Sequence, residues 1–154
     1  MIDAPQITQS KEQFTAVIHL EIAKDEIQRA MGPAIQEVMS AIAAQGIPMA
    51  GPVFSHHFKI TATSWDFEVG VPVKAPVATA GRVRPSALPA TRVARTNYRG
   101  PYEGLGAAWG ELQAWLRSRA HVAAGDLWEV YVRGPESNPD PKAWCTELNQ
   151  PLTK

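Results

Sequence analysis

The sequence contains one short motif twice, at positions 79 residues apart. Residues 65–72 and residues 144–151 both have tryptophan first, glutamate fourth and proline eighth. A Gly-Pro dipeptide precedes each copy, at 32–33 and at 100–101. Repetition of this kind predicts a duplicated structural unit. We therefore expect two halves related by a pseudo-twofold axis, with a cleft between them that suits a ligand.

The hydrophobic pattern of the first half predicts the order strand, helix, strand, strand. Strands are expected at residues 14–22, 53–60 and 65–73, where β-branched and aromatic residues are frequent. From Asp25 onward, apolar side chains recur every three or four residues and predict one helix. Gly32-Pro33 interrupts this pattern, which indicates either a kink or the point where the helix properly starts.

The second half repeats this order, and the segment between the halves adds one element. Residues 75–89 contain three prolines and are expected to hold an edge strand. Strands are expected at 91–98, 127–132 and 143–148, with a helix at 102–119. We predict an α+β fold in which two fused strand-helix-strand-strand repeats, about 12–74 and 80–152, build an antiparallel sheet with two main helices and a central cleft.

The balance of charge argues against direct binding of nucleic acid. Fifteen basic and fifteen acidic side chains give a formal net charge of zero, whereas a nucleic-acid binder normally carries a basic surplus. The local excess of arginine between residues 82 and 99 is expected to be a solvated strand face rather than an anion site. Hydrophobic content of 45% is typical of one globular domain over residues 1–154.

The single cysteine, Cys145, excludes an internal disulfide and is typical of a reducing compartment. It lies in an expected strand without a patterned histidine partner, so we interpret it as a buried thiol rather than a nucleophile. The first residues do not form a secretory signal, and no apolar run is long enough to span a membrane. A cytoplasmic protein without a membrane partner is expected.

The histidines and glycines do not predict a metal or cofactor site. His56 and His57 are adjacent in an expected strand, so their side chains point to opposite faces, and His19 and His121 lie far away in sequence. The glycines after Gly100 lack the Lys-Ser/Thr ending of a phosphate loop. We therefore expect neither metal nor cofactor.

The strand at residues 127–132 carries a carboxylate among apolar neighbours. Because side chains alternate in a strand, Leu127, Glu129 and Tyr131 share one face. Burial of such a carboxylate requires a protein cation, a hydrogen-bond network or a positively charged ligand. An exposed glutamate on a half-buried strand fits the pattern equally well.

Other residues extend this set of candidates. Glu68 and Glu147 occupy the repeated motif and either divide acid and base work or serve one structural task twice. Aromatic residues are concentrated in the second half, although Trp109 and Trp115 fall on the apolar face of the expected helix. Rings close to a carboxylate form a suitable site for a flat, lipophilic cation.

Several segments together resemble the GyrI-like small-molecule-binding domain family. Tyr98 to Leu105, followed by Trp109, Leu112 and Trp115-Leu116, resembles the signature of its second half. Residues 128–131 and 144–148 resemble its closing motif, and residues 67–73 its first-half strand. The family includes the effector-binding domains of AraC-type and MerR-type transcription regulators and the gyrase inhibitory protein. The matches span nearly the whole chain.

The resemblance implies a ligand cleft between two repeats, with a glutamate at its floor. Glu129 matches that position, and Tyr131 and Trp109 are the expected neighbours. Tyr98, Glu147 and Trp65 complete the ligand-binding set that we predict. Relatives that sense many drugs bind lipophilic cations, so the expected ligand is amphipathic and either cationic or aromatic.

Three functions follow from the resemblance, and the residues alone do not separate them. The leading one is a stand-alone small-molecule-binding protein, since 154 residues leave no room for a DNA-binding domain beside the two repeats. The second is a hydrolase of a reactive cyclopropanoid xenobiotic, with Glu129 and either Tyr131 or Tyr98 activating water. The third is an inhibitor of a protein partner, of the gyrase inhibitory type.

Overall fold

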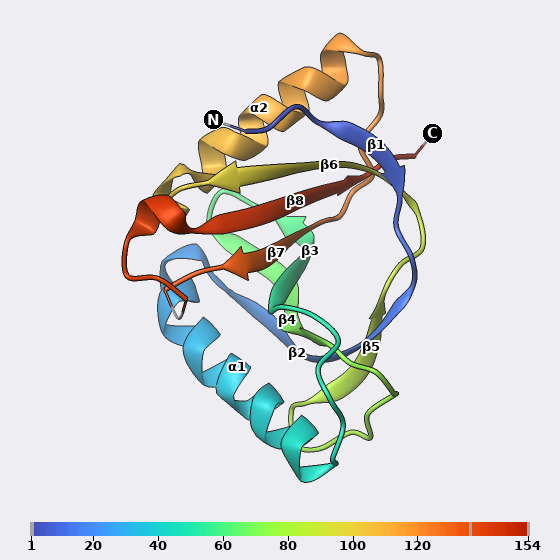
Figure 1. The fold of residues 1–154 in the computed structure, drawn as a ribbon, viewed down its shortest axis with the longest axis vertical. Helices are drawn as coiled ribbons and strands as arrows, with labels where there is room; N and C mark the ends of the chain where they lie inside the picture. Colours follow the sequence, from blue (N-terminus) through green and yellow to red (C-terminus); the bar gives the residue numbers. More distant parts are fainter. Residues whose placement is uncertain (1, 136, 154) are drawn as a thin grey trace. The chain divides into compact units, whose positions relative to one another are not determined.

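The computed structural model describes residues 2–135 and 137–153 and has an α+β architecture (Figure 1). The chain divides into two compact units. We call Lys11–Ala90 the N-terminal unit, and Met1–Ser10 together with Thr91–Lys154 the C-terminal unit. Neither main helix in the described part of the chain combines the length and the hydropathy that crossing a bilayer requires.

The N-terminal unit contains a four-stranded antiparallel sheet and one long helix. The order of its strands is β3 (Phe54–Ile60), β4 (Ser64–Pro72), β2 (Gln13–Ala23) and β5 (Arg84–Leu88). A short 3-10 helix, η1 (Lys24–Glu26), leads into α1 (Ile27–Ala44). The predicted edge strand is therefore confirmed as β5. The helix begins before Gly32 and continues through Pro33, so the alternative start at this dipeptide is wrong.

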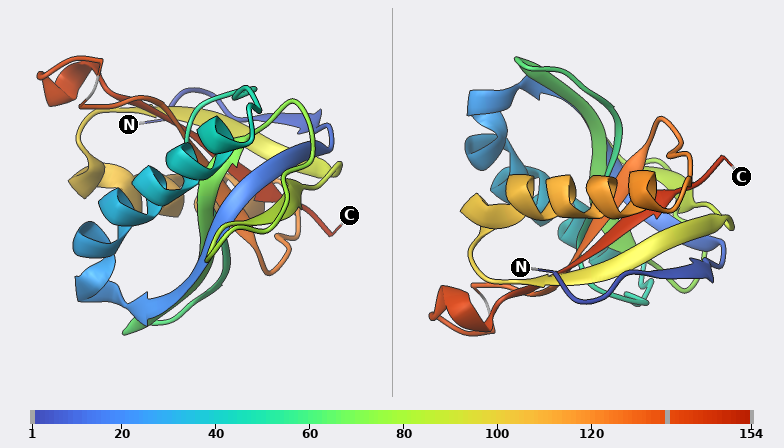
Figure 2. Two further views of the ribbon diagram at one scale, coloured as in Figure 1. Left: turned by 90° about the horizontal axis from the view of Figure 1, so that it is seen from below. Right: turned by 90° about the horizontal axis from the view of Figure 1, so that it is seen from above.

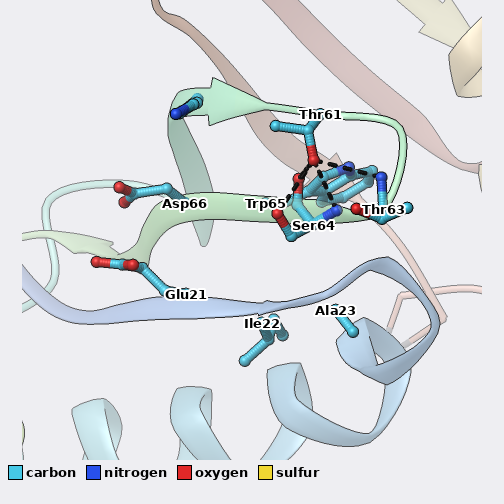
Figure 3. A pocket seen from close by; sticks show the side chains of 9 residues that line it. Glu21, Ile22, Ala23, Thr61, Thr63, Ser64, Trp65 and Asp66 are labelled. Carbon is cyan, nitrogen blue, oxygen red and sulfur yellow. Dashed lines mark hydrogen bonds between the residues drawn. The ribbon is translucent and has the colours of Figure 1, made fainter.

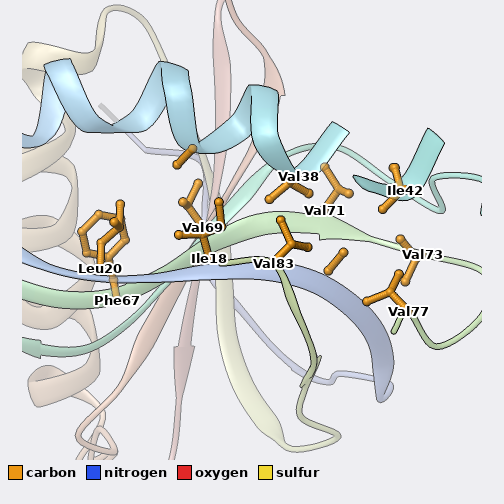
Figure 4. Close-up of a cluster of buried hydrophobic side chains, with 12 residues drawn as sticks. Ile18, Leu20, Val38, Ile42, Phe67, Val69, Val71, Val73, Val77 and Val83 are labelled. Carbon is orange, nitrogen blue, oxygen red and sulfur yellow. The ribbon is translucent and has the colours of Figure 1, made fainter. Parts of the chain in front are cut away.

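Helix α1 packs on one face of this sheet through the predicted apolar stripe. Val38 and Ala34 are fully buried against alternate residues of β2 and β4, including Ile18 and Val69 (Figure 4). The intervening residues of these strands, such as His19 and Glu68, therefore lie on the opposite face of the sheet. Burial of about ten aliphatic side chains at about 1.5 to 3 kcal/mol each makes this cluster the main favourable contribution to folding of the unit.

The C-terminal unit has the same kind of sheet. The order of its strands is β1 (Gln6–Gln9), β6 (Arg92–Arg99), β8 (Cys145–Pro151) and β7 (Leu127–Arg133), and all neighbours are antiparallel. The 3-10 helix η2 (Tyr102–Gly104) precedes α2 (Leu105–Ser118), and η3 (Pro141–Ala143) precedes β8. Figure 2 shows α2 lying across the strands of its own unit.

The core of the C-terminal unit confirms the predicted face of α2. Leu112 and Leu116 are buried against Ala94, Tyr98 and Leu148 of the sheet. The predicted order strand, helix, strand, strand is confirmed in both units. Strand β1 was not predicted: it pairs with β6 and places the first residues of the chain in the C-terminal unit.

Candidate functional site

Glu129 lies in β7 on the sheet face that carries α2. It is directly opposite Leu148 in β8, and Leu148 belongs to the core beneath that helix. Only 9% of the Glu129 surface is exposed. Of the interpretations that the sequence allowed, the exposed glutamate is therefore wrong, and a buried carboxylate with hydrogen-bonding partners is correct.

Two aromatic donors hold the Glu129 carboxylate. The indole Nε1 of Trp109, in α2, donates to Oε2 over 2.6 Å. The hydroxyl of Tyr131, two residues further along β7, donates to Oε1 over 2.8 Å. Hydrogen bonds to an ionised acceptor are stronger than neutral ones, so both contacts favour the charged form of the acid. The predicted grouping of Glu129, Tyr131 and Trp109 is present in the structure.

Burial opposes these hydrogen bonds. Desolvation raises the pKa of the Glu129 carboxyl above its usual value, and the donors Trp109 and Tyr131 lower it by a smaller amount. No salt bridge to Glu129 is present in the described part of the chain. A buried carboxylate with hydrogen-bond donors but without a cation is a site where a cationic ligand gains the most from charge neutralisation.

Further aromatic rings extend from Tyr131 to the surface. The ring of Tyr102 lies 5.8 Å from that of Tyr131 in an edge-on arrangement, and the ring of Trp144 lies 4.9 Å from Tyr102. Tyr102 is 37% exposed, and the indole of Trp144 donates to the carbonyl of Asn138 over 2.8 Å. These rings provide flat surfaces of negative potential next to the acid.

Tyr98 has a different environment. It is 6% exposed in the core beneath α2, and its hydroxyl donates to the carbonyl of Pro101 over 2.8 Å. A Cβ at Gly104 would lie 2.0 Å from that hydroxyl, so a glycine is needed for the chain to pass over the tyrosine. The Tyr98 hydroxyl therefore stabilises the turn into α2, whereas the hydrogen bonds of Glu129 come from Trp109 and Tyr131.

Glu147 lies on the other face of the same sheet. It alternates with Leu148 along β8, and its Oε1 accepts from Asn149 over 3.1 Å and lies 3.5 Å from Nε of Arg95. Glu68, its counterpart in the repeat, accepts a hydrogen bond from Ser86 over 2.8 Å. Both glutamates thus have partners within their own unit, which favours the structural interpretation of the repeated motif.

Trp65 belongs to the N-terminal unit. Its ring contacts His57 and Phe67 edge-on, with centroids 5.1 and 6.4 Å away, and its indole nitrogen is buried without a hydrogen-bond partner in the described chain. Cys145 is buried in β8, as predicted for a packed thiol. The arginines at 82, 95 and 99 pair with Glu37, Glu147 and Asp3.

Sequence reasoning did not assign a site role to Tyr102 and Trp144. Both lie inside the segments that carry the family resemblance, which is the signal that could have identified them. The contact between the rings of Tyr102 and Trp144 could not be predicted, because both residues are distant from Glu129 in sequence and a proline-rich loop precedes Trp144.

Comparison with solved structures gives the same fold at low sequence identity. The crystal structure of the EcmrR C-terminal domain superposes with a TM-score of 0.87 at 20% identity, covering 98% of each chain. EcmrR in a cryo-electron-microscopy complex with DNA also gives a TM-score of 0.87, and the present chain spans 57% of that protein. SAV2435, solved bound to tetraphenylphosphonium, gives 0.67 at 11% identity, with 98% of this chain and 94% of that one covered.

A family model supplies the assignment. No curated protein matches the chain in sequence. The model of the GyrI-like small molecule binding domain, however, matches residues 3–151, nearly the whole chain. The chain therefore belongs to the GyrI-like small-molecule-binding domain family.

Proposed function

We propose that this protein binds an amphipathic cation or a flat aromatic compound against Glu129. The observation that carries the proposal is the buried carboxylate itself, which is hydrogen-bonded by Trp109 and Tyr131 and has no cationic partner among the described residues. The ring of Tyr102 continues this surface to solvent. That SAV2435 was solved with tetraphenylphosphonium supports the same class of ligand.

Folding has already removed most of the water from Glu129, so a cation that reaches it does not need to desolvate it again. The two donors fix the carboxylate in place, and preorganisation lowers the cost of ordering on binding. A neutral ligand of the same shape would gain the aromatic contacts but not the Coulomb attraction.

The test is a fluorescence titration with a matched pair of ligands, methyltriphenylphosphonium and the neutral triphenylphosphine oxide. The five tryptophans include Trp109, whose indole touches the acid. We expect Glu129→Gln to weaken binding of the cation more than about tenfold, which is about 1.4 kcal/mol, and to leave the oxide unchanged.

Glu147→Gln is the matched control. It removes one carboxylate from the neighbouring strand, but on the opposite face of the same sheet. Its affinity for both compounds is expected to equal that of the wild type. Equal affinity of Glu129→Gln and wild type for the phosphonium would refute the role of Glu129 as counter-ion.

A hydrolytic function is the second candidate, favoured by the direct hydrogen bond between Tyr131 and Glu129. A carboxylate with a raised pKa is a better general base near neutral pH, and a phenol beside it can orient water. Two structural neighbours from Listeria innocua are described as hydrolases. Loss of a cyclopropane-bearing electrophile with time, abolished in Glu129→Gln, would support turnover, whereas stoichiometric binding would exclude it for that compound.

The remaining parts of the proposal come from the sequence. The cleft between the repeats, the cytoplasmic location and a protein partner of the gyrase inhibitory type stay predictions. We assign the ligand contacts to Glu129, Tyr131 and Trp109 first, and to Tyr102 and Trp144 next. Tyr98, Glu147 and Trp65 were predicted from the sequence as ligand-binding residues, but we leave them out of the proposed site because their side chains make the structural contacts described above.

A further inference from the structure

A second group of ionisable side chains lies in the N-terminal unit, on the sheet face opposite α1. His19 and Glu21 of β2 and Asp66 of β4 each offer one ligand atom, and these atoms all lie within 4.8 Å of one another. Nε2 of His19 is hydrogen-bonded to Oδ1 of Asp66. We infer that His19, Glu21 and Asp66 form a binding site for a divalent transition-metal ion, exemplified by Zn²⁺.

The register of the strands explains why these groups meet. Glu21 is directly opposite Asp66 in the β2–β4 pair, and His19 precedes Glu21 on the same face. Like charges directly opposite each other destabilise an antiparallel pair, so the two carboxylates impose a cost that a bound cation would remove. Glu21 makes no hydrogen bond or ion pair within the described part of the chain.

The geometry needs little adjustment to bind an ion. Zinc binds nitrogen and oxygen ligands at about 2.0 to 2.2 Å, so two ligand atoms of one ion are at most about 4.4 Å apart. Rotation of exposed side chains closes the remaining few tenths of an ångström. Because a metal ion needs the lone pair of His19 Nε2, its hydrogen bond to Asp66 opens when the ion binds. About a third of each of these two side chains is exposed, so an ion has access.

A separate observation is the pocket beside the cluster. Glu21 and Asp66 line a cavity of about 560 Å³ together with Trp65 and the hydroxyl-bearing residues at 61, 63 and 64. Figure 3 shows the carboxylates of Glu21 and Asp66 projecting side by side from neighbouring strands. Three protein ligands leave a zinc ion at least one open position, as in sites that bind water or a substrate group.

Lys59 is the competing cation within the protein. It lines the same pocket and is opposite Asp66 in the β3–β4 pair, although no ion pair between the two is present among the described residues. Its ammonium group repels an incoming metal ion. Removal of this charge in Lys59→Gln is therefore expected to tighten metal binding, the opposite of the effect of removing a ligand.

Calorimetric titration of the untagged protein with Zn²⁺, and separately with Ca²⁺, tests the site. We expect one Zn²⁺ per chain and much weaker Ca²⁺ binding, since imidazole is a ligand of transition metals. His19→Gln, Glu21→Gln and Asp66→Asn should each weaken Zn²⁺ at least about tenfold, the loss typical of even an outer-shell partner. Glu37→Gln removes an equal charge from α1 and should change nothing.

Spectroscopy locates the ion independently. Co²⁺ should quench the fluorescence of Trp65, and the Trp65→Phe variant should lose that part of the quenching while binding Zn²⁺ normally. Circular dichroism verifies that each variant is folded. Equal affinities for Zn²⁺ and Ca²⁺, loss of affinity in Glu37→Gln, or retention of Zn²⁺ in Asp66→Asn would overturn the inference and leave an acidic surface only.

Discussion

Strands β3 and β7 occupy equivalent places in the two units but carry different chemistry. His57 pairs with Phe67 in the N-terminal unit, and Tyr131 pairs with Thr146, which lies 79 residues after Phe67, in the C-terminal unit. The residue two positions earlier is Ser55 in one strand and Glu129 in the other. Both pairs are joined by a hydrogen bond of 2.8 Å.

The Ser55–His57 pair and the Glu129–Tyr131 pair differ in charge. Burial, and then repulsion from His56, lowers the pKa of His57 to about 4, so the Ser55–His57 pair is neutral at neutral pH. The ring of His57 stacks on Phe67 with centroids 4.9 Å apart. In the other unit the carboxyl group of Glu129 can ionise, although burial makes its charged form less favourable. The equivalent position therefore carries a neutral, packed pair in the N-terminal unit and an ionisable pair, at which we propose that the ligand binds, in the C-terminal unit.

The buried groups His57 and Glu129 should make stability respond to pH in opposite directions. Its pKa is lower in the folded state than the ordinary 6.5, so the unfolded chain binds the extra proton. Its stabilising contribution is present above pH 6.5 and is lost as the pH falls toward about 4, by up to about 3 kcal/mol. Over this pH range, the free energy of unfolding measured by urea denaturation should fall less for His57→Gln than for the wild type. Identical pH profiles would contradict a neutral buried His57.

Gly70 provides the next largest effect. Its counterpart 79 residues later is Asn149, which carries a side chain and accepts a hydrogen bond from Arg95 over 2.6 Å. At Gly70 a Cβ would lie 1.9 Å from the carbonyl oxygen of Ala16 in the neighbouring strand. Gly70→Ala should therefore lower the free energy of unfolding by about 2 kcal/mol.

Gly106→Ala is the control for this substitution. It lies in α2, where an added Cβ would meet no atom within 4 Å. Alanine should stabilise this exposed helix position by about 0.5 kcal/mol, because glycine costs more backbone entropy. A neutral effect of Gly70→Ala would show that β2 and β4 can separate there without loss.

Glu129 should produce a pH effect of the opposite sign to that of His57. Because its pKa is higher in the folded state than the usual 4.5, the folded protein holds the proton more tightly. The stability due to the protonated acid is present below pH 4.5 and is lost as the pH rises through the raised pKa. Glu129→Gln should therefore gain stability relative to wild type at pH 8 compared with pH 4.5, measured by urea denaturation. A constant difference would indicate that the pKa is not raised.

The sequence predicted the elements well where burial follows a local period. The apolar stripes of α1 and α2 and the alternation in β7 depend on neighbours a few residues apart, so they can be seen without a structure. Strand β1 was missed because Gln6–Gln9 is short and polar and is held in place by pairing with β6, about 90 residues later. Pairing at such a distance leaves no local pattern.

Some contacts of the candidate site could be predicted from local sequence, and others depend on the fold. Alternation placed Tyr131 beside Glu129, and the family resemblance supplied Trp109. The partner of the Tyr98 hydroxyl was not predictable, because it depends on how the chain turns at Gly100 and Pro101. The scattered histidines predicted no metal site. The carboxylates beside His19 could not be predicted, because the β2–β4 register brings them together from distant parts of the sequence.

The smallest expected effects concern the two tryptophans of the repeat, Trp65 and Trp144. The indole of Trp144 donates to Asn138, whereas that of Trp65 is buried without a partner in the described chain. Trp144→Phe should thus lose a hydrogen bond, at about 0.5 to 1 kcal/mol, measured by urea denaturation. Trp65→Phe removes an unsatisfied donor and should be neutral or slightly stabilising. If both variants lose the same free energy, packing of the larger ring dominates at both positions, and the hydrogen bond of Trp144 contributes nothing to the difference between the units.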